Sequence, residues 1–254
     1  MTAIPFSPKY IHIKQKGPTM LRSSALVLAL LTLTAPFTSA AEKQYHPHYL
    51  TPDAIDSTAL LPNPPAVDSV EHQEELNLLL KLQQDRTPAE VARATEEEHH
   101  LSIFAFADVL GPNFTPANCP QTAAFFKSAL NADLSYFNKT AKAHFARPRP
   151  ETDSRIHPLF HEKDGSYPSG HSIRATLMAE VLSSVLPQYR DALIIRSQQM
   201  GWDREIAGVH FPSDIFAGRI LGQALAHALL ANPEVRSQVD ALQPELQKAL
   251  APAK

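Results

Sequence analysis

The sequence is poor in cysteine and glycine, and both shortages limit what the chain can be. Cys119 is the one cysteine in 254 residues, which excludes an intrachain disulfide. We therefore expect Cys119 to be a small buried apolar side chain rather than a regulatory or metal-binding thiol. The chain has only eight glycines, and they gather where the backbone must turn or approach another group closely.

Basic clusters and long apolar runs are scarce as well. The formal net charge is −3 and no run of Lys and Arg occurs, whereas binding to a phosphate backbone requires basic residues clustered on one face. We therefore expect no nucleic acid as a partner. After residue 40 no apolar segment is long enough to cross a bilayer, so we expect no membrane anchor in the mature chain.

The N-terminus has the pattern of a secretory signal peptide. Basic residues precede the apolar segment 25–33, and the small residues at 38–40 offer a cleavage site. The apolar segment is too short to span a membrane. We predict a signal peptide over residues 1–40, with Met20 as an alternative start, and a periplasmic or secreted mature protein.

Helical patterns dominate the rest of the chain. Residues 41–66 are rich in proline and predict an extended arm that lies on the body. Amphipathic spacing begins near Val70, and Thr87-Pro88-Ala89-Glu90 is a capping box that starts a second helix. Further helices are predicted over about 121–146, 171–186, 188–207, 212–230 and 234–250. No convincing strand-type alternation occurs, so the expected fold class is all-α: a single-domain helical bundle over residues 67–254 with a proline-rich N-terminal arm.

The first motif that carries chemistry is Lys142 with Arg149-Pro150. Lys142 lies near the end of the predicted helix 121–146, and Arg149 follows about two turns later, so both cations can lean toward one point. On their own they would also fit two solvated surface residues. We expect the neighbouring His144 and Arg147 to lie at the surface or at a rim.

The second motif is Pro168-Ser169-Gly170-His171, which opens a predicted helix. Unpaired backbone N–H groups and the positive end of the helix dipole make such a start suitable for an anion. Ser169 can add a hydroxyl donor, Gly170 lets a ligand approach the backbone, and His171 can donate a proton. On its own the segment would also fit an ordinary N-cap with a partly exposed histidine.

The third motif is Arg204 followed by His210 and Asp214. Pro212 can begin a helix whose first turn carries Asp214 back to the His210 ring. A carboxylate on Nδ1 would fix the tautomer and leave Nε2 free to act as a nucleophile. Arg204 would add a planar fork of donors for phosphate oxygens, although a buried structural His–Asp pair also fits the pattern.

Two further groups of residues invite a metal-binding interpretation. Residues 96–100 read Glu-Glu-Glu-His-His, but neighbours on a helix point in different directions, so we expect a solvated face. His157 and His161 flank Pro158 in a predicted loop and lack an evident third ligand. We therefore expect no metal site and no cofactor.

These motifs together resemble a known family. The pattern comprises Lys142, Arg149-Pro150, Pro168-Ser169-Gly170-His171, Arg204, His210 and Asp214, and it resembles the phosphatidic-acid phosphatase type 2 superfamily. Within that superfamily, segments 165–171 and 208–214 resemble the secreted class A bacterial acid phosphatases, and the likeness covers most of the mature chain. It implies an all-helical core and catalysis without a metal. Asp203 departs from the usual serine: facing the pocket it would repel a dianionic substrate, and facing away it would pair with another group.

We accordingly expect an acid phosphatase that hydrolyses small phosphate monoesters in two steps. His210 attacks phosphorus while His171 protonates the leaving alcohol, and His171 then activates the water that hydrolyses the phosphohistidine. The phosphoryl oxygens would be held by Lys142, Arg149, Ser169, the Gly170 N–H and Arg204. The segment 151–165 is expected at the pocket rim.

Other classes of protein stay open at this point. A vanadium-dependent haloperoxidase resembles the same superfamily and holds vanadate with equivalent side chains. A non-catalytic periplasmic phosphate-binding protein would need the cations but not His210 paired with Asp214. A metal-dependent hydrolase fits less well. The proline-rich arm could pack on a neighbouring subunit, so a homo-oligomer also stays open, and the physiological substrate is not predicted.

Overall fold

The computed structural model describes residues 46–251. The predicted signal peptide, the alternative start at Met20, the beginning of the arm and the last three residues lie outside the described residues. Within residues 46–251 the chain forms helices, turns and loops and no strand, which confirms the all-α fold class. The same residues include no helix with both the length and the apolarity needed to cross a membrane.

The helices largely follow the predicted ranges. The longer ones are α2 (Val70–Asp85), α3 (Pro88–His100), α6 (Leu130–Phe145), α7 (Gly170–Val185), α8 (Arg190–Ile206) and α9 (Pro212–Ala231). The shorter ones are α1 (Ser57–Leu60), α4 (Ala107–Leu110), α5 (Pro120–Ala124), α10 (Pro233–Ala241) and α11 (Gln243–Leu250). The predicted capping box is present at the start of α3, where the Thr87 side chain accepts from the Glu90 N–H and the Glu90 side chain accepts from the Thr87 N–H.

Two predicted helices are interrupted in the structure. The segment 121–146 consists of α5 and α6 joined by a π-helical turn over Phe125–Ala129. The segment 234–250 is divided at Leu242 into α10 and α11. Pro244 follows that division, and its missing N–H prevents one continuous helix there.

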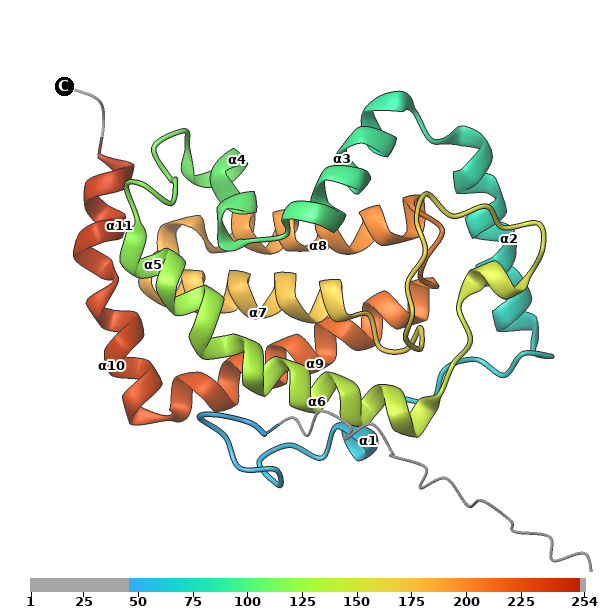
Figure 1. Ribbon diagram of the computed structural model, residues 1–254, viewed down its shortest axis with the longest axis horizontal. Coiled ribbons are helices and arrows are strands. Elements are labelled where there is room, and N and C mark those ends of the chain that lie inside the picture. Colours follow the sequence, from blue (N-terminus) through green and yellow to red (C-terminus); the bar gives the residue numbers. More distant parts are fainter. Residues whose placement is uncertain (1–45, 252–254) are drawn as a thin grey trace, which may run out of the picture. The chain divides into compact units, whose positions relative to one another are not determined.

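Helix α7 is the central element, with α8 and α9 packed along it (Figure 1). Most of its side chains are buried. Gly218 and Gly222 let α9 approach closely. A Cβ at Gly218 would lie 2.7 Å from the carbonyl oxygen of Ser169, the N-cap of α7, and a Cβ at Gly222 would lie 2.7 Å from that of Ile173. The Ser169 N–H donates to the Asp214 carbonyl at 3.0 Å. This close packing holds the N-terminal ends of α7 and α9 side by side.

Residues 46–66 form the described part of the arm. Asp133 on α6 accepts hydrogen bonds from the backbone N–H groups of His48, Tyr49 and Leu50. The Tyr167 hydroxyl donates to the Pro62 carbonyl. The described part of the arm therefore lies on the body, with the short helix α1 as its regular segment. Outside the arm, Cys119 is fully buried, as predicted for a small apolar side chain.

Candidate active site

The three sequence motifs meet at one small cavity. Its volume is about 190 Å³, and its walls include Lys142, Arg149, Gly170, His171 and His210. At ~30 Å³ per water molecule, this is room for about six waters. The cavity can therefore hold a tetrahedral anion together with a few water molecules.

His210 is buried and held from both sides of its ring. Its Nδ1 lies 3.3 Å from Asp214 Oδ2, and its Nε2 lies 3.1 Å from Arg149 Nη1. A guanidinium can only donate, so Nε2 accepts and Nδ1 carries the proton toward Asp214. The structure thus brings His210 and Asp214 together as the third motif predicts, and it aims Arg149 at the nitrogen that would attack.

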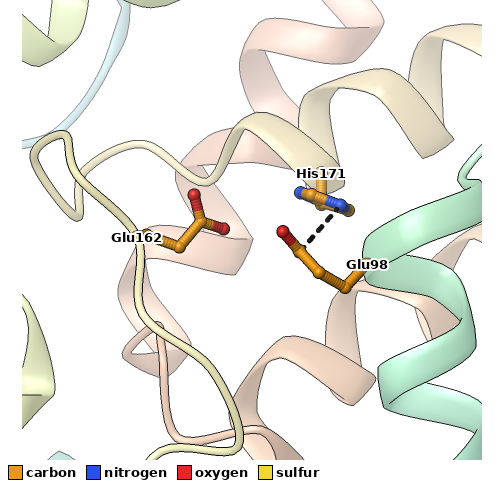
Figure 2. A group of neighbouring side chains, drawn as sticks. All are labelled: Glu98, Glu162 and His171. Atoms are coloured by element: carbon orange, nitrogen blue, oxygen red, sulfur yellow. Dashed lines mark ion pairs between the residues drawn. The ribbon is translucent and has the colours of Figure 1, made fainter.

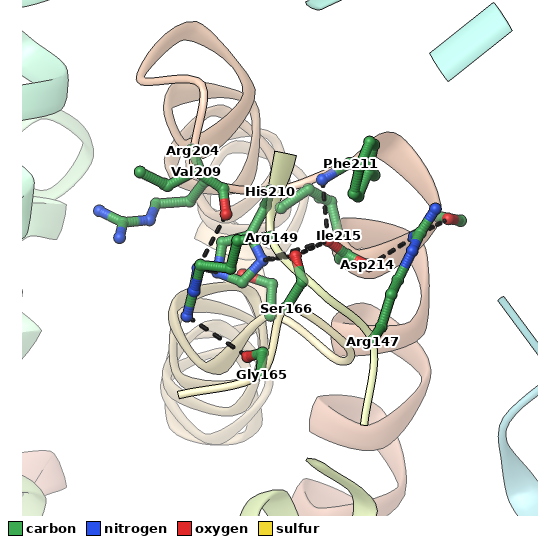
Figure 3. Close-up of polar contacts among 12 residues, drawn as sticks. Arg147, Arg149, Gly165, Ser166, Arg204, Val209, His210, Phe211, Asp214 and Ile215 are labelled. Carbon is green, nitrogen blue, oxygen red and sulfur yellow. Dashed lines mark hydrogen bonds and ion pairs between the residues drawn. The ribbon is translucent and has the colours of Figure 1, made fainter. Parts of the chain in front are cut away.

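Asp214 is fixed by several donors. The Phe211 N–H donates to its Oδ2 at 2.8 Å, and the Ser166 hydroxyl donates to the same oxygen (Figure 3). Arg147 donates to the other oxygen at 2.6 Å. Pro212 begins α9 as expected, so Asp214 lies in its first turn with a carboxylate that cannot rotate freely.

The prediction that Arg147 lies at the surface is wrong. Its side chain is only 5% exposed and pairs with both Asp214 and Glu75, each at 2.6 Å. The guanidinium also stacks on the Phe211 ring, 4.0 Å from its centroid. Arg147 reaches inward because its partners come from α2 and α9, which the local sequence around residue 147 cannot reveal. The neighbouring His144 is exposed, as predicted.

Carboxylates cover the cations in this arrangement. Asp164 lies 3.3 Å from the Lys142 ammonium and 2.7 Å from the Arg149 guanidinium. Arg204 pairs with Glu98 at 2.7 Å and also with Glu162. An entering anion must therefore compete with these carboxylates for the same donors. Sequence reasoning placed the segment 151–165 at the rim but identified neither acidic residue within it.

The expectation of a solvated face for residues 96–100 is also wrong in part. Glu96 is exposed, but Glu97 is buried and pairs with Arg196 at 2.7 Å. Glu98 faces the site and lies 3.5 Å from His171 Nε2. Consecutive residues do point in different directions around α3, but two of those directions lead into the protein.

Glu98, Glu162 and His171 place possible ligand atoms within 4.8 Å of one another, and each residue is half-buried (Figure 2). Both carboxylates, however, already neutralise the Arg204 guanidinium. A permanent positive charge at that distance repels a second cation. We therefore interpret this group as the anionic cover of Arg204 rather than as a metal site.

The second motif forms the start of α7 as predicted. Ser169 is the N-cap, and its hydroxyl accepts from the Ser172 N–H at 3.4 Å. Gly170 and His171 lie in the wall of the cavity, whereas Ser169 is fully buried behind it. The helix start thus faces the cavity, and a direct bond from the Ser169 hydroxyl to a phosphate remains a prediction.

Asp203 faces away from the cavity. Its buried carboxylate accepts from Arg93 Nε at 2.8 Å and from Arg93 Nη2 at 2.7 Å. Gln199 adds a third donor at 3.2 Å. Of the two outcomes expected for this departure from the usual serine, the structure shows the one in which Asp203 pairs with another group.

Burial and nearby positive charge lower the pKa of both site histidines. Burial is the larger cause for each; Arg204 adds to the lowering at His171, and Arg149 and Lys142 add to it at His210. Both rings are therefore neutral near pH 7 before an anion binds. Neutral His210 is the form that can attack, while His171 needs a proton to act as an acid. A bound phosphate dianion would raise the pKa of both rings.

The all-helical fold and this cation-lined cavity agree with the family comparison. Residues 123–237 match the model of the PAP2 superfamily, so this part of the chain is a PAP2 superfamily domain.

Among its relatives is a non-specific acid phosphatase of Salmonella typhi, which is 29% identical over 242 residues, or 89% of this chain and 93% of that protein. A non-specific acid phosphatase of Providencia stuartii is 28% identical over 77% of this chain and 82% of that protein. An acid phosphatase of Zymomonas mobilis is 31% identical over 62% of this chain and 63% of that protein. A bacterial vanadium-dependent iodoperoxidase shares the fold, with a TM-score of 0.51, 18% identity and coverage of 70% of this chain and 54% of that one.

Proposed function

We propose that this protein is a secreted or periplasmic acid phosphatase that hydrolyses phosphate monoesters through a phosphohistidine intermediate. The observation that carries the proposal is the chain of contacts Asp214–His210–Arg149. His210 and Arg149 line the cavity together with His171. A protein that only binds phosphate needs the cations, but it gains nothing from a nucleophile held in one tautomer. The similarity to non-specific acid phosphatases over most of the chain supports the same activity.

In the first step, the Nε2 lone pair of His210 attacks phosphorus. The bond from phosphorus to the ester oxygen breaks, and protonated His171 gives its proton to that oxygen, so the product leaves as an alcohol. Asp214 stabilises the positive charge that develops on the His210 ring, since its carboxylate lies 3.3 Å from Nδ1. Arg149 must move its donors from Nε2 to the phosphoryl oxygens before this attack, because its hydrogen bond occupies the attacking lone pair in the structure.

In the second step, neutral His171 takes a proton from a water that attacks the phosphohistidine. The bond between phosphorus and Nε2 breaks, inorganic phosphate leaves, and both histidines return to their starting states. Lys142, Arg149 and Arg204 stabilise the charge on the equatorial oxygens in both transition states. The Gly170 N–H at the start of α7 adds a donor on the same side.

The location and the subclass rest on sequence. The pattern of residues 1–40 supports export, and segments 165–171 and 208–214 resemble class A acid phosphatases. We propose further that no metal takes part, because fixed cations already supply the charge stabilisation that a metal would give.

A panel of chromogenic phosphate monoesters, assayed across pH with EDTA present, tests the proposal. We expect turnover in EDTA, its loss in His210→Gln, and its retention in the matched control His144→Gln, which alters an exposed histidine. No turnover in the wild type would favour the phosphate-binding alternative. Bromide oxidation that depends on vanadate and peroxide, without ester hydrolysis, would favour the haloperoxidase. Loss of turnover in EDTA would favour a metal-dependent hydrolase.

A further inference from the structure

A second cavity lies next to the one that His171 and His210 line. Its volume is about 430 Å³, which falls within the ~300–1,000 Å³ typical of small-molecule sites. Its walls are mostly apolar: Leu101, Ile103, Phe104, Ala123, Phe126 and Met178. The smaller cavity can hold a phosphate, and this larger one has the volume and chemistry for an organic group.

Arg174 is the residue that the two cavities share. The two cavities therefore adjoin at this side chain. Arg174 donates to Asn131 at 2.6 Å, and no carboxylate within residues 46–251 lies within ion-pair distance of it. Without such an anchor its guanidinium can turn toward a bound phosphate while its methylene stem lines the apolar side.

The face of α7 sets the direction from one cavity to the other. His171, Arg174 and Met178 are spaced three and four residues apart, so they follow one another along one face of the helix. His171 lies in the wall of the small cavity, Arg174 in both, and Met178 in the apolar one. The apolar cavity thus begins one turn beyond the proposed general acid.

The chemistry of the proposed reaction requires the leaving group on the side of the phosphate that faces His171. Attacking and leaving atoms lie roughly in line on opposite sides of phosphorus. His210 is the attacking group, so the ester oxygen points to His171, which protonates it. The organic group attached to that oxygen then lies on the His171 side of the phosphate, and Arg174, one turn along α7 from His171, is where the apolar cavity adjoins the small one.

We propose that the 430 Å³ cavity binds the apolar organic group of the substrate, and that the protein prefers phosphate monoesters of apolar alcohols, such as medium-length alkyl phosphates, over those of small polar ones. This inference rests on the proposed phosphatase function. It adds a leaving-group subsite to that function and a reason for selectivity.

Hydrolysis of ethyl, butyl and hexyl phosphate tests the subsite. The parent alcohols are alike in reactivity, so kcat should vary little across the series. Each CH₂ buried in the cavity should lower KM about fourfold until the cavity is full, the factor that corresponds to ~0.8 kcal/mol per methylene. A KM that does not depend on chain length in the wild type would overturn the subsite.

Ala123→Phe places a bulky ring in the cavity and should remove the dependence of KM on chain length. Ala132→Phe is the matched control, because Ala132 is also half-buried but lines a different cavity. Inhibition by inorganic phosphate should be equal in the wild type and both variants, since neither residue touches the phosphate site. A chain-length trend that persists in Ala123→Phe would contradict the assignment.

The possible outcomes separate the two proposals. If none of the three esters is hydrolysed, the phosphatase function itself is overturned. Hydrolysis of all three with equal KM would leave that function standing and would overturn only the subsite. Because the wild-type series gives this answer without any substitution, an Ala123→Phe variant that does not fold leaves the test intact.

Discussion

Replacing Arg147 with methionine should destabilise the protein severely, although the sequence suggests an ordinary surface arginine. The side chain is 5% exposed and neutralises Asp214, which is fully buried, and Glu75, which is 11% exposed. Methionine keeps much of the volume but leaves both carboxylates without their counter-ion. Removing one partner of a buried ion pair costs ~3–5 kcal/mol. For a domain of this size the loss corresponds to a fall in Tm of about 6–20 °C, at ~2–4 °C per kcal/mol.

Urea denaturation at pH 7 measures this effect. Arg155→Met is the matched control, because Arg155 also pairs with a carboxylate, that of Asp153, but its side chain is 53% exposed. Water replaces an exposed partner at little cost, so the midpoint of the control should stay close to that of the wild type. Equal shifts for Arg147→Met and Arg155→Met would refute the argument that burial sets the energy of these pairs.

Three further predictions follow from the same contacts. Asp203→Ser should cost little stability, because Arg93 is 35% exposed and can turn to water. Arg93→Met leaves the buried Asp203 carboxylate without its ion-pair partner and should lower the denaturation midpoint clearly more. Equal losses of stability in the two variants would contradict this. Glu162→Gln should lower the inhibition constant of inorganic phosphate several-fold, because it frees Arg204 from a competing carboxylate; an unchanged constant in steady-state kinetics would contradict that competition. The pKa of His171 is lowered in the folded protein, so protonation of this ring favours unfolding as pH falls below ~6.5. The difference in the free energy of unfolding between the wild type and His171→Asn, measured by denaturation, should therefore shift against the wild type from pH 7 to pH 5. A difference that does not change with pH would refute this.

The sequence predicted most of the fold because its helix signals are local. A capping box begins α3, Pro212 begins α9, and the segment Pro168-Ser169-Gly170 opens α7. The breaks carry weaker signals. Helix α6 ends where Ala146 adopts a left-handed φ of 45°, a conformation usually taken by glycine. Pro148 and Pro150 mark the end of this helix in the sequence, but no glycine marks the left-handed residue.

The residues of the candidate site also differ in whether a local sequence signal identifies them. His171 and His210 were identifiable because short-range spacing places each of them beside a helix start. Glu98 and Glu162 were not, since they come from α3 and from the loop before α7 and meet only at Arg204. The same holds for Arg147, whose two partners are more than sixty residues away in the sequence. Partners distant in sequence require the fold before their pairing can be seen.

Trapping the covalent intermediate tests the central claim most directly. The enzyme would be mixed with phosphorus-32-labelled p-nitrophenyl phosphate and quenched in alkaline detergent, because phosphohistidine withstands base better than acid. This ester has a good leaving group, so His171→Asn should still be phosphorylated but should hydrolyse the intermediate slowly and accumulate label. The account predicts label on the peptide that contains His210 in this variant and none when His210→Gln is added. Label that persists in the double variant, or its absence from His171→Asn during turnover, would contradict the account.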